Sequence, residues 1–276
     1  MQPDSRTTHP HATQVLCACM RKGGVLKSSL VRWVASVLTE TGKQALLSSP
    51  ARVLAVDLDP QSNLTQMFIG TERTANLERS LYNVLVEKAP LSEVLLPITP
   101  QIDLAPSNVQ MELTEYALIN ERRREDRLKQ ALEPIKAPYD YILLDCPPNL
   151  GLLTVNALSA SDSVFVPCET DFLALASLPL TLNTIHDVKQ EINPQLTLLG
   201  IVATKHKPHT NMGQQALAKL TRDLDEASLP LFATVIKDRT KYREANALQL
   251  GITDYAPTTE EAATMRALVK EIIDGK

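Results

Sequence analysis

Short apolar runs alternate along the chain with longer segments in which apolar residues recur at helical spacing. This alternation predicts an α/β fold with a parallel sheet covered by helices on both faces. The predicted strands are residues 14–20, 52–57, 102–105, 141–145, 163–167, 198–204 and 231–236. The predicted helices are residues 28–41, 77–87, 108–117, 120–132, 152–159, 174–191, 214–227, 242–250 and 260–273. Right-handed crossovers make such a chain a doubly wound, mostly parallel twisted sheet, which binds ligands outside the carboxyl ends of its strands.

The domain organisation follows from length and composition. The 276 residues contain no Gly/Ser-rich or Pro-rich linker, so a single domain is expected over residues 14–276. Residues 1–13 are polar and include Pro3 and Pro10, and they are expected to form a flexible tail. Hydrophobic residues make up 44% of the chain and aromatic residues only 4%, which suits aliphatic helices packed on a sheet.

Charge and cysteine usage exclude several classes of protein. A net charge of -4 argues against a chain that coats nucleic acid with its whole surface, although local basic patches remain possible. No apolar run reaches the length of a membrane span and the start lacks a signal pattern, so a cytoplasmic chain is expected. Cys17, Cys19, Cys146 and Cys168 lie in or beside apolar runs without zinc-site spacing, which favours buried reduced thiols over cluster ligands.

A candidate phosphate-binding loop follows the first predicted strand. Its sequence is Lys22-Gly23-Gly24-Val25-Leu26-Lys27-Ser28-Ser29. The glycines let backbone N–H groups converge, and the helix that follows adds the positive end of its dipole. Lys27 would neutralise phosphate oxygens and the Ser28 hydroxyl would ligate magnesium. The alternative is an ordinary strand-to-helix turn with two surface lysines.

The loop departs from the strict pattern G-x-x-x-x-G-K-[ST], which would place glycine at Arg21 and Leu26. A left-handed backbone at Leu26 would cost about 1 to 2 kcal/mol. Binding of a micromolar nucleotide supplies roughly 8 kcal/mol. Strain of that size would weaken ATP binding without abolishing it, so ATP with magnesium is expected to bind.

Carboxylates end two further predicted strands. Asp145 follows the apolar run 141–144, which is the placement of a Walker B aspartate that holds magnesium. Asp57 and Asp59 end another strand with one residue between them. One of them could lie near the metal while the other positions the attacking water. The alternative is a capped turn before a helix that begins near Pro60.

Together these segments resemble the ParA/MinD family of deviant Walker P-loop ATPases, and within it the ParA (Soj-like) partition branch. The family loop K-G-G-x-x-K-[ST] matches Lys22 to Ser28, and further similar segments extend the resemblance from Gln14 to the C-terminus. These segments are residues 56–63, 139–158, 200–204, 234–239 and 242–245.

The resemblance implies roles for individual residues. Lys22 would be the signature lysine that reaches the partner's phosphates in an ATP-bound homodimer, and together with Lys27 and Asp59 it would be catalytic. Asp59 would orient the hydrolytic water. Ser28, Asp57 and Asp145 would hold Mg²⁺ or its waters. Residues 22–29 would bind the nucleotide, and Thr204 and Lys237 would flank its base. Departures from the family pattern are Leu26, a short insertion at 44–50 and the pair Lys237-Asp238.

The resemblance also implies a function. It predicts a slow ATPase that dimerises on ATP, binds DNA nonspecifically on the nucleoid and is released by a ParB-like partner. The rival interpretation is a scaffold with little hydrolysis, disabled by Leu26. The C-terminal segment lacks the basic amphipathic character of a MinD-like membrane helix, so no membrane role is expected.

Basic residues gather in three places. Lys237, Arg239, Lys241 and Arg243 against Asp238 give a local net charge of +3, and the last three basic residues are the predicted DNA contacts. A solvated helix start is the alternative. The basic run at residues 122–129 is interleaved with acidic residues and is expected to form an exposed, salt-bridged face. Residues 205–209 follow a strand near the nucleotide edge and are expected to form an exposed loop, with an auxiliary DNA or base contact as the alternative.

Overall fold

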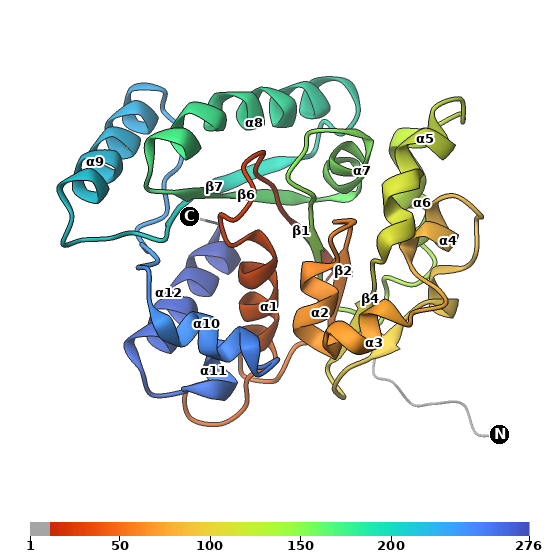
Figure 1. The fold of residues 1–276 in the computed structure, drawn as a ribbon, viewed down its shortest axis with the longest axis horizontal. Helices are drawn as coiled ribbons and strands as arrows, with labels where there is room; N and C mark the ends of the chain where they lie inside the picture. Colours follow the sequence, from red (N-terminus) through yellow and green to blue (C-terminus); the bar gives the residue numbers. More distant parts are fainter. Residues whose placement is uncertain (1–11, 276) are drawn as a thin grey trace.

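The computed structural model describes residues 12–275. Most of the predicted tail, residues 1–13, lies outside the described part of the chain. Thr13 is described, and its hydroxyl lies 2.8 Å from the carbonyl oxygen of Tyr139. Within the described residues a single sheet organises the fold (Figure 1).

The sheet has seven strands in the order β3-β4-β2-β5-β1-β6-β7. All neighbouring strands pair in parallel except β3, which runs antiparallel to β4 at one edge. The predicted doubly wound, mostly parallel sheet is confirmed. The strands are β1 Gln14–Ala18, β2 Val53–Asp57, β3 Leu96–Pro97, β4 Ile102–Ala105, β5 Tyr141–Asp145, β6 Ser163–Glu169 and β7 Thr197–Thr204.

Alternating side chains of the central strands pack into two hydrophobic cores, one on each face of the sheet. Cys17 of β1 lies in one core, whereas its neighbours Leu16 and Ala18 lie in the other. Because both faces are covered, the strands are apolar almost throughout. Each core is completed by its own group of helices, which lie on opposite sides of the sheet in Figure 1.

The first core contains residues of α4 Leu81–Leu85, α6 Arg127–Leu132, α7 Leu152–Ala160, α8 Phe172–Glu191 and α9 Asn211–Glu226. The second contains residues of α1 Lys27–Leu38, α2 Asn63–Ile69, α10 Thr240–Ala247, α11 Ile252–Tyr255 and α12 Glu260–Asp274. The remaining helices are α3 Thr71–Ala75, α5 Thr114–Leu118 and the 3₁₀ helices η1 Leu91–Glu93, η2 Val109–Leu113 and η3 Arg124–Asp126.

The predicted strand at residues 231–236 is wrong. This segment touches β7 through an isolated bridge between Leu231 and Ile201. The carboxylate of Glu271, on α12, accepts the backbone N–H groups of Ala233 at 2.6 Å and Thr234 at 2.9 Å. Because a side chain takes these two donors, they are not free to build a strand ladder, and β7 remains the edge strand.

Several predicted helices are shorter or broken. The segment 77–87 is helical only in α4, and 108–117 divides into η2 and α5. The segment 120–132 is broken because Arg123 has a left-handed backbone with φ of 55°, so only η3 and α6 form. The predicted salt-bridged face is nevertheless present, since Arg123 pairs with Asp126 and Arg127 with Glu121. The helix α3 was not predicted from the sequence pattern, whereas α2 lies where the capped-turn alternative placed a helix, near Pro60.

All four cysteines are buried free thiols, as predicted. Cys17 of β1 and Cys146, which directly follows β5, place their sulfur atoms 3.2 Å apart. Burial raises the pKa of Cys17 and raises the pKa of Cys168 to about 12. These thiols therefore stay protonated and unreactive at neutral pH.

Among the described residues, no helix combines the length and the apolar character that crossing a membrane requires. The last described helix, α12, buries Met265, Leu268 and Ile272 in the second core, as expected of an ordinary packed helix.

Candidate functional site

The loop between β1 and α1 has the shape of an anion-binding turn. Gly24 and Leu26 both have left-handed backbones, with φ of 75° and 76°. Leu26 is the N-cap of the 12-residue helix α1, and its side chain offers no capping hydrogen bond. The first N–H groups of α1 therefore have no side-chain cap, which leaves them available to an anion.

The left-handed backbone predicted as a possibility at Leu26 is present. A residue with a Cβ atom pays about 1 to 2 kcal/mol for this conformation. The side chain is half-buried and packs against the second core while it borders the cavity described below. Leu26 thus combines a strained backbone with an apolar side chain at a site that would receive phosphate.

Two hydrogen bonds fix the loop from inside. The Thr204 hydroxyl, at the end of β7, donates to the carbonyl oxygen of Val25 at 3.2 Å. The ammonium group of Lys27 donates to the carbonyl oxygen of Lys22 at 3.2 Å. Val25 and Thr204 are fully buried. The structure therefore gives Thr204 a role in holding the loop, and its contact with a base stays a prediction.

A cavity of about 430 Å³ opens over this loop. That volume lies in the range of small-molecule sites. The predicted nucleotide residues that line it are Gly23, Gly24, Leu26, Lys27, Ser28, Ser29 and Lys237. Asp59 borders it as well, and so do Arg239 and Arg243, which were predicted to contact DNA. The cavity therefore lies between the phosphate loop and the segment 237–243.

Asp145 is a buried carboxylate without a partner. It ends β5, it is fully buried, and neither of its oxygens has a hydrogen-bond partner among the described residues. Burial, followed by the neighbouring charge of Asp57, raises the pKa of Asp145 well above its usual range. A buried carboxylate costs free energy unless it is paired or ligates a metal. Two free carboxylate oxygens therefore fit the predicted role of Asp145 at a magnesium ion.

Asp57 has the opposite environment. It is paired in register with Asp145 across β2 and β5. One oxygen accepts the Thr65 hydroxyl at 2.7 Å and the Thr65 N–H at 2.8 Å, and the other accepts the Asp59 N–H at 3.1 Å. Burial raises the pKa of Asp57 to about 7, although the Thr65 hydrogen bonds oppose the shift. Asp57 therefore holds the turn that carries Asp59, and its role at a metal stays a prediction.

Asp59 lies where two cavities meet. One of its oxygens accepts the Gln61 N–H at 3.0 Å, and only 5% of the residue is exposed. It borders the 430 Å³ cavity and also a neighbouring cavity of about 880 Å³ that extends toward α5. Burial raises the pKa of Asp59. This position next to the phosphate loop suits a residue that orients water.

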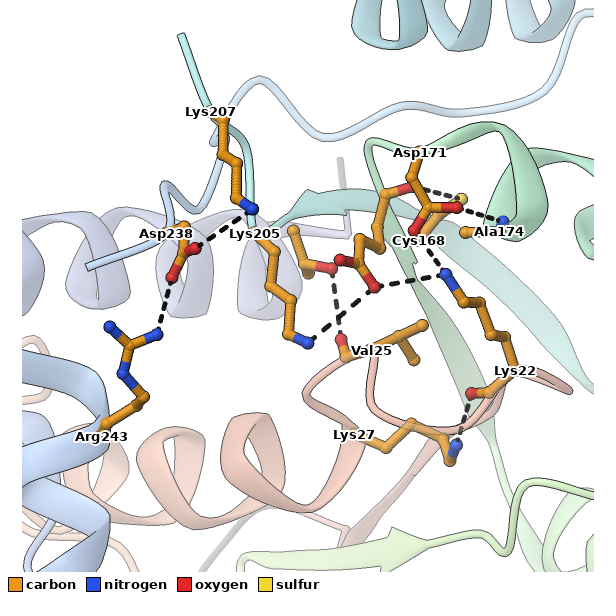
Figure 2. Close-up of polar contacts among 12 residues, drawn as sticks. Lys22, Val25, Lys27, Cys168, Asp171, Ala174, Lys205, Lys207, Asp238 and Arg243 are labelled. Atoms are coloured by element: carbon orange, nitrogen blue, oxygen red, sulfur yellow. Dashed lines mark hydrogen bonds and ion pairs between the residues drawn. The ribbon is translucent and has the colours of Figure 1, made fainter. Parts of the chain in front are cut away.

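Lys22 does not line the cavity over its own loop. Figure 2 shows its side chain directed toward Asp171, the N-cap of α8. Its ammonium group forms ion pairs with Asp171 and with Glu169, the latter at 3.4 Å. Partial burial opposes the charged form, but the hydrogen bond to Asp171 and both acidic charges outweigh it, so the pKa of Lys22 is raised. The predicted contact of Lys22 with the phosphates of a partner subunit stays a prediction.

The segment 237–243 is less basic than its own residues suggest. Lys237 and Arg239 pair with Glu260, Lys241 pairs with Glu261 at 3.9 Å, and Arg243 donates to Asp238 at 3.3 Å. Glu260 and Glu261 belong to α12 and reduce the local net charge from +3 to +1. Lys241 does not line the cavity. DNA contacts at Arg239, Lys241 and Arg243 remain predictions.

Two acidic residues at the site were not predicted from the sequence. Glu169 ends β6 and Asp171 follows it by two residues, the same spacing as Asp57 and Asp59 at the end of β2. The rule that ligand sites gather at the carboxyl ends of parallel strands could have found them. The expectation of an exposed loop holds for Lys207 and His209. It is wrong for His206, which is buried, and for Lys205, which is half-buried and lines the cavity.

The chain is similar in sequence to several known proteins. The sequence profile of a family described as an AAA domain matches residues 13–198. The sporulation initiation inhibitor protein Soj of Bacillus subtilis is 35% identical over 94% of this chain and 98% of its own length. The chromosome partitioning protein ParA of Myxococcus xanthus is 36% identical over 75% of this chain and 70% of its own.

A solved structure has the same fold. The cobyrinic acid a,c-diamide synthase of Mycobacterium smegmatis, crystallised with ADP and magnesium, superposes with a TM-score of 0.79 at 30% identity. The superposition covers 95% of this chain and 94% of that one.

Proposed function

The chain belongs to the ParA/Soj family of P-loop ATPases, and we propose that it is a DNA partition ATPase which dimerises on binding ATP. In the dimeric state it binds DNA nonspecifically on the nucleoid in the cytoplasm. A ParB-like partner stimulates its slow hydrolysis and so releases it. The observation that carries the proposal is the cavity that joins the phosphate loop to Asp59, next to the unpaired carboxylate of Asp145.

The phosphate loop and three polar residues beside it have separate chemical tasks in this proposal. The N–H groups of the loop and the Lys27 ammonium would bind phosphate oxygens. The Ser28 hydroxyl and the Asp145 carboxylate would hold Mg²⁺, which neutralises charge on the phosphates. Asp59, held by the Asp57 turn, would orient the attacking water.

Dimerisation would use Lys22. Its side chain points away from its own cavity and is 25% exposed, so it is placed at the rim of the site. This placement supports a contact with the phosphates bound by a partner subunit. A lysine about 4 Å from a phosphate would contribute up to about 4 kcal/mol at an effective dielectric of 20, before desolvation.

DNA binding would require two copies of the segment 237–243, because one copy carries little net charge. The pairing of Lys237 and Arg239 with Glu260 leaves a weak basic patch in a single subunit. Two patches on one face would give the four or so phosphate contacts that lower affinity roughly a hundredfold between about 50 and 200 mM salt. Nucleotide-independent or salt-insensitive DNA binding would contradict this arrangement.

A steady-state ATPase assay with DNA and a ParB-like partner tests the proposal. The wild-type chain should hydrolyse ATP slowly alone and faster with both additions, whereas Asp59→Ala should bind ATP and show no stimulation. The left-handed backbone of Leu26 favours one rival, a nucleotide-binding scaffold for DNA or a protein cargo with little hydrolysis. Equal rates for the wild type and Asp59→Ala would support that scaffold.

A further inference from the structure

Glu169 is shared by two lysines at the mouth of the phosphate loop. Its Oε2 atom lies 3.4 Å from the Lys22 ammonium and 3.9 Å from the Lys205 ammonium. Figure 2 shows the two lysines approaching from opposite sides, Lys22 from the loop and Lys205 from the end of β7. Lys22 has Asp171 as a second acidic partner, whereas the only ion pair of Lys205 among the described residues is the one with Glu169.

The Lys205 backbone is held in an unusual conformation. Its φ is 49°, in the left-handed region that residues with a Cβ atom seldom adopt. Hydrogen bonds secure both neighbours: Thr204 accepts the Thr170 N–H at 3.1 Å, and the His206 N–H donates to Ile236 at 2.9 Å. Such conformations persist where the surrounding structure determines them, and they gather at ligand sites.

This backbone aims the Lys205 side chain over the phosphate loop. A Cβ atom built on Gly24 would lie 3.9 Å from the Lys205 ammonium. Lys205 lines the 430 Å³ cavity and its side chain is 32% exposed, whereas Lys22 does not line that cavity. Within one subunit, Lys27 therefore faces the site from the loop, and Lys205 faces it from the residue that follows β7.

We propose that Lys205 binds the phosphates of the nucleotide within its own subunit and leaves Glu169 when it does so. The inference rests on the proposed function, because it assumes a nucleotide in this cavity. The separation of 3.9 Å from Glu169 exceeds hydrogen-bond distance, so the pair holds Lys205 loosely. A polyphosphate carries more negative charge than one carboxylate and attracts the ammonium more strongly.

The chain offers a matched control for this residue. Lys207 is two positions along the same segment, its side chain is 62% exposed, and its ammonium lies 3.9 Å from Asp238. It therefore has a similar ion pair but does not line the cavity. Lys205→Met and Lys207→Met remove the same charge, and Lys205→Arg retains it.

Calorimetric titration with ATP, ADP and adenosine tests the inference without relying on turnover. Lys205→Met should lower the affinity for ATP and for ADP about tenfold and change the affinity for adenosine by no more than about twofold. The affinities of Lys205→Arg for all three ligands should stay within about threefold of the wild-type values, and those of Lys207→Met within about twofold. Glu169→Gln should raise the affinity for ATP when Lys205 is present, but it should not do so in a chain that also carries Lys205→Met.

Three results would overturn the inference. The first is ATP binding by Lys205→Met within about twofold of the wild type. The second is an equal loss for adenosine and ATP, which would assign Lys205 to the shape of the cavity. The third is a wild-type chain that binds no ATP, and this result would remove the proposed function as well. Circular dichroism of each variant confirms that the folded state is compared.

Discussion

Asp57 and Asp145 occupy paired positions on two neighbouring parallel strands, and both are fully buried, but only Asp57 has hydrogen-bond donors. Asp57 is thus part of the folded framework, whereas Asp145 has no hydrogen-bond partner, and the nearby Ser28 hydroxyl and Lys27 charge offset its burial only in part. Substitution of each aspartate by asparagine should therefore change the free energy of unfolding in opposite directions.

Replacing these aspartates by asparagine should change stability with opposite signs in EDTA without nucleotide. Asp57→Asn turns an amide toward the Thr65 and Asp59 donors and should lower the free energy of unfolding by about 1 to 3 kcal/mol. Asp145→Asn removes an unpaired buried charge and should raise it by about 1 kcal/mol. Denaturant unfolding measures both, with the exposed Asp187→Asn as control. A loss of stability in Asp145→Asn would show that its carboxylate has protein partners.

At Leu26, glycine should be more stable than alanine, which reverses the usual order. Leu26→Ala keeps the strained Cβ and loses packing against the second core, whereas Leu26→Gly loses the same packing and relieves the strain. Relief of about 1 to 2 kcal/mol exceeds the entropic cost of glycine, about 0.5 to 1 kcal/mol. Thermal unfolding of the two variants decides the order. Greater stability of the alanine variant would mean that the left-handed backbone carries little strain.

Asp171→Asn should release Lys22 while it preserves the helix cap. Asparagine caps helices about as well as aspartate and can still accept the Ala174 N–H. The pKa of Lys22 should fall back toward its ordinary value of 10.5. A carbon-13 NMR titration of the lysine side chains measures the shift, and an unchanged Lys22 would indicate that the ion pair does not persist in solution.

The Lys22–Asp171 ion pair also predicts a pH window for stability. Burial acts to raise the pKa of Asp171, but the hydrogen bond and charge of Lys22 together with the Ala174 N–H outweigh it, so this pKa is lowered. A lowered carboxyl pKa gives stability that is present above the unfolded value of 3.8 and is lost as pH falls. The raised Lys22 pKa gives stability that is lost above 10.5. The free energy of unfolding of the wild type should exceed that of Asp171→Asn by at most about 1 kcal/mol between pH 3.8 and pH 10.5. The difference should shrink gradually as pH falls below the lower limit or rises above the upper one.

The segment 237–243 should separate nucleotide binding from DNA binding. Arg243 lines the cavity, whereas Lys241 does not and pairs with Glu261. Arg243→Ala should lower the affinity for both ATP and DNA. Lys241→Ala should lower the affinity for DNA alone and reduce the slope of log affinity against log salt concentration by about one unit. Fluorescence anisotropy with labelled DNA and labelled ATP measures the two affinities. Equal effects of both variants on ATP would argue against this division.

The sequence predicted the sheet well because its strands are buried on both faces and read as continuous apolar runs. It also placed Asp57, Asp145 and the phosphate loop at one edge, since parallel strands end together. The segment 231–236 has the same apolar character, yet Glu271 removes two of its donors from any ladder. That competition comes from a helix distant in sequence, so a local pattern could not reveal it.

Charge was predicted less well than architecture. A count along residues 237–243 shows four basic residues and one acidic residue, but Glu260 and Glu261 approach from α12. The direction of Lys22 depends likewise on Asp171, which is distant in sequence. Ion pairs across the fold decide which basic residues face a ligand, and they become visible only when the chain is assembled.

The burial of all four cysteines gives the chain a practical property. Thiol-reactive dyes attack exposed thiolates, and these sulfur atoms are neither exposed nor easily deprotonated. A cysteine introduced at an exposed position, such as Asp187→Cys on α8, should therefore take up a maleimide fluorophore selectively in the otherwise native chain. Energy transfer between two labelled populations would then report subunit association in real time.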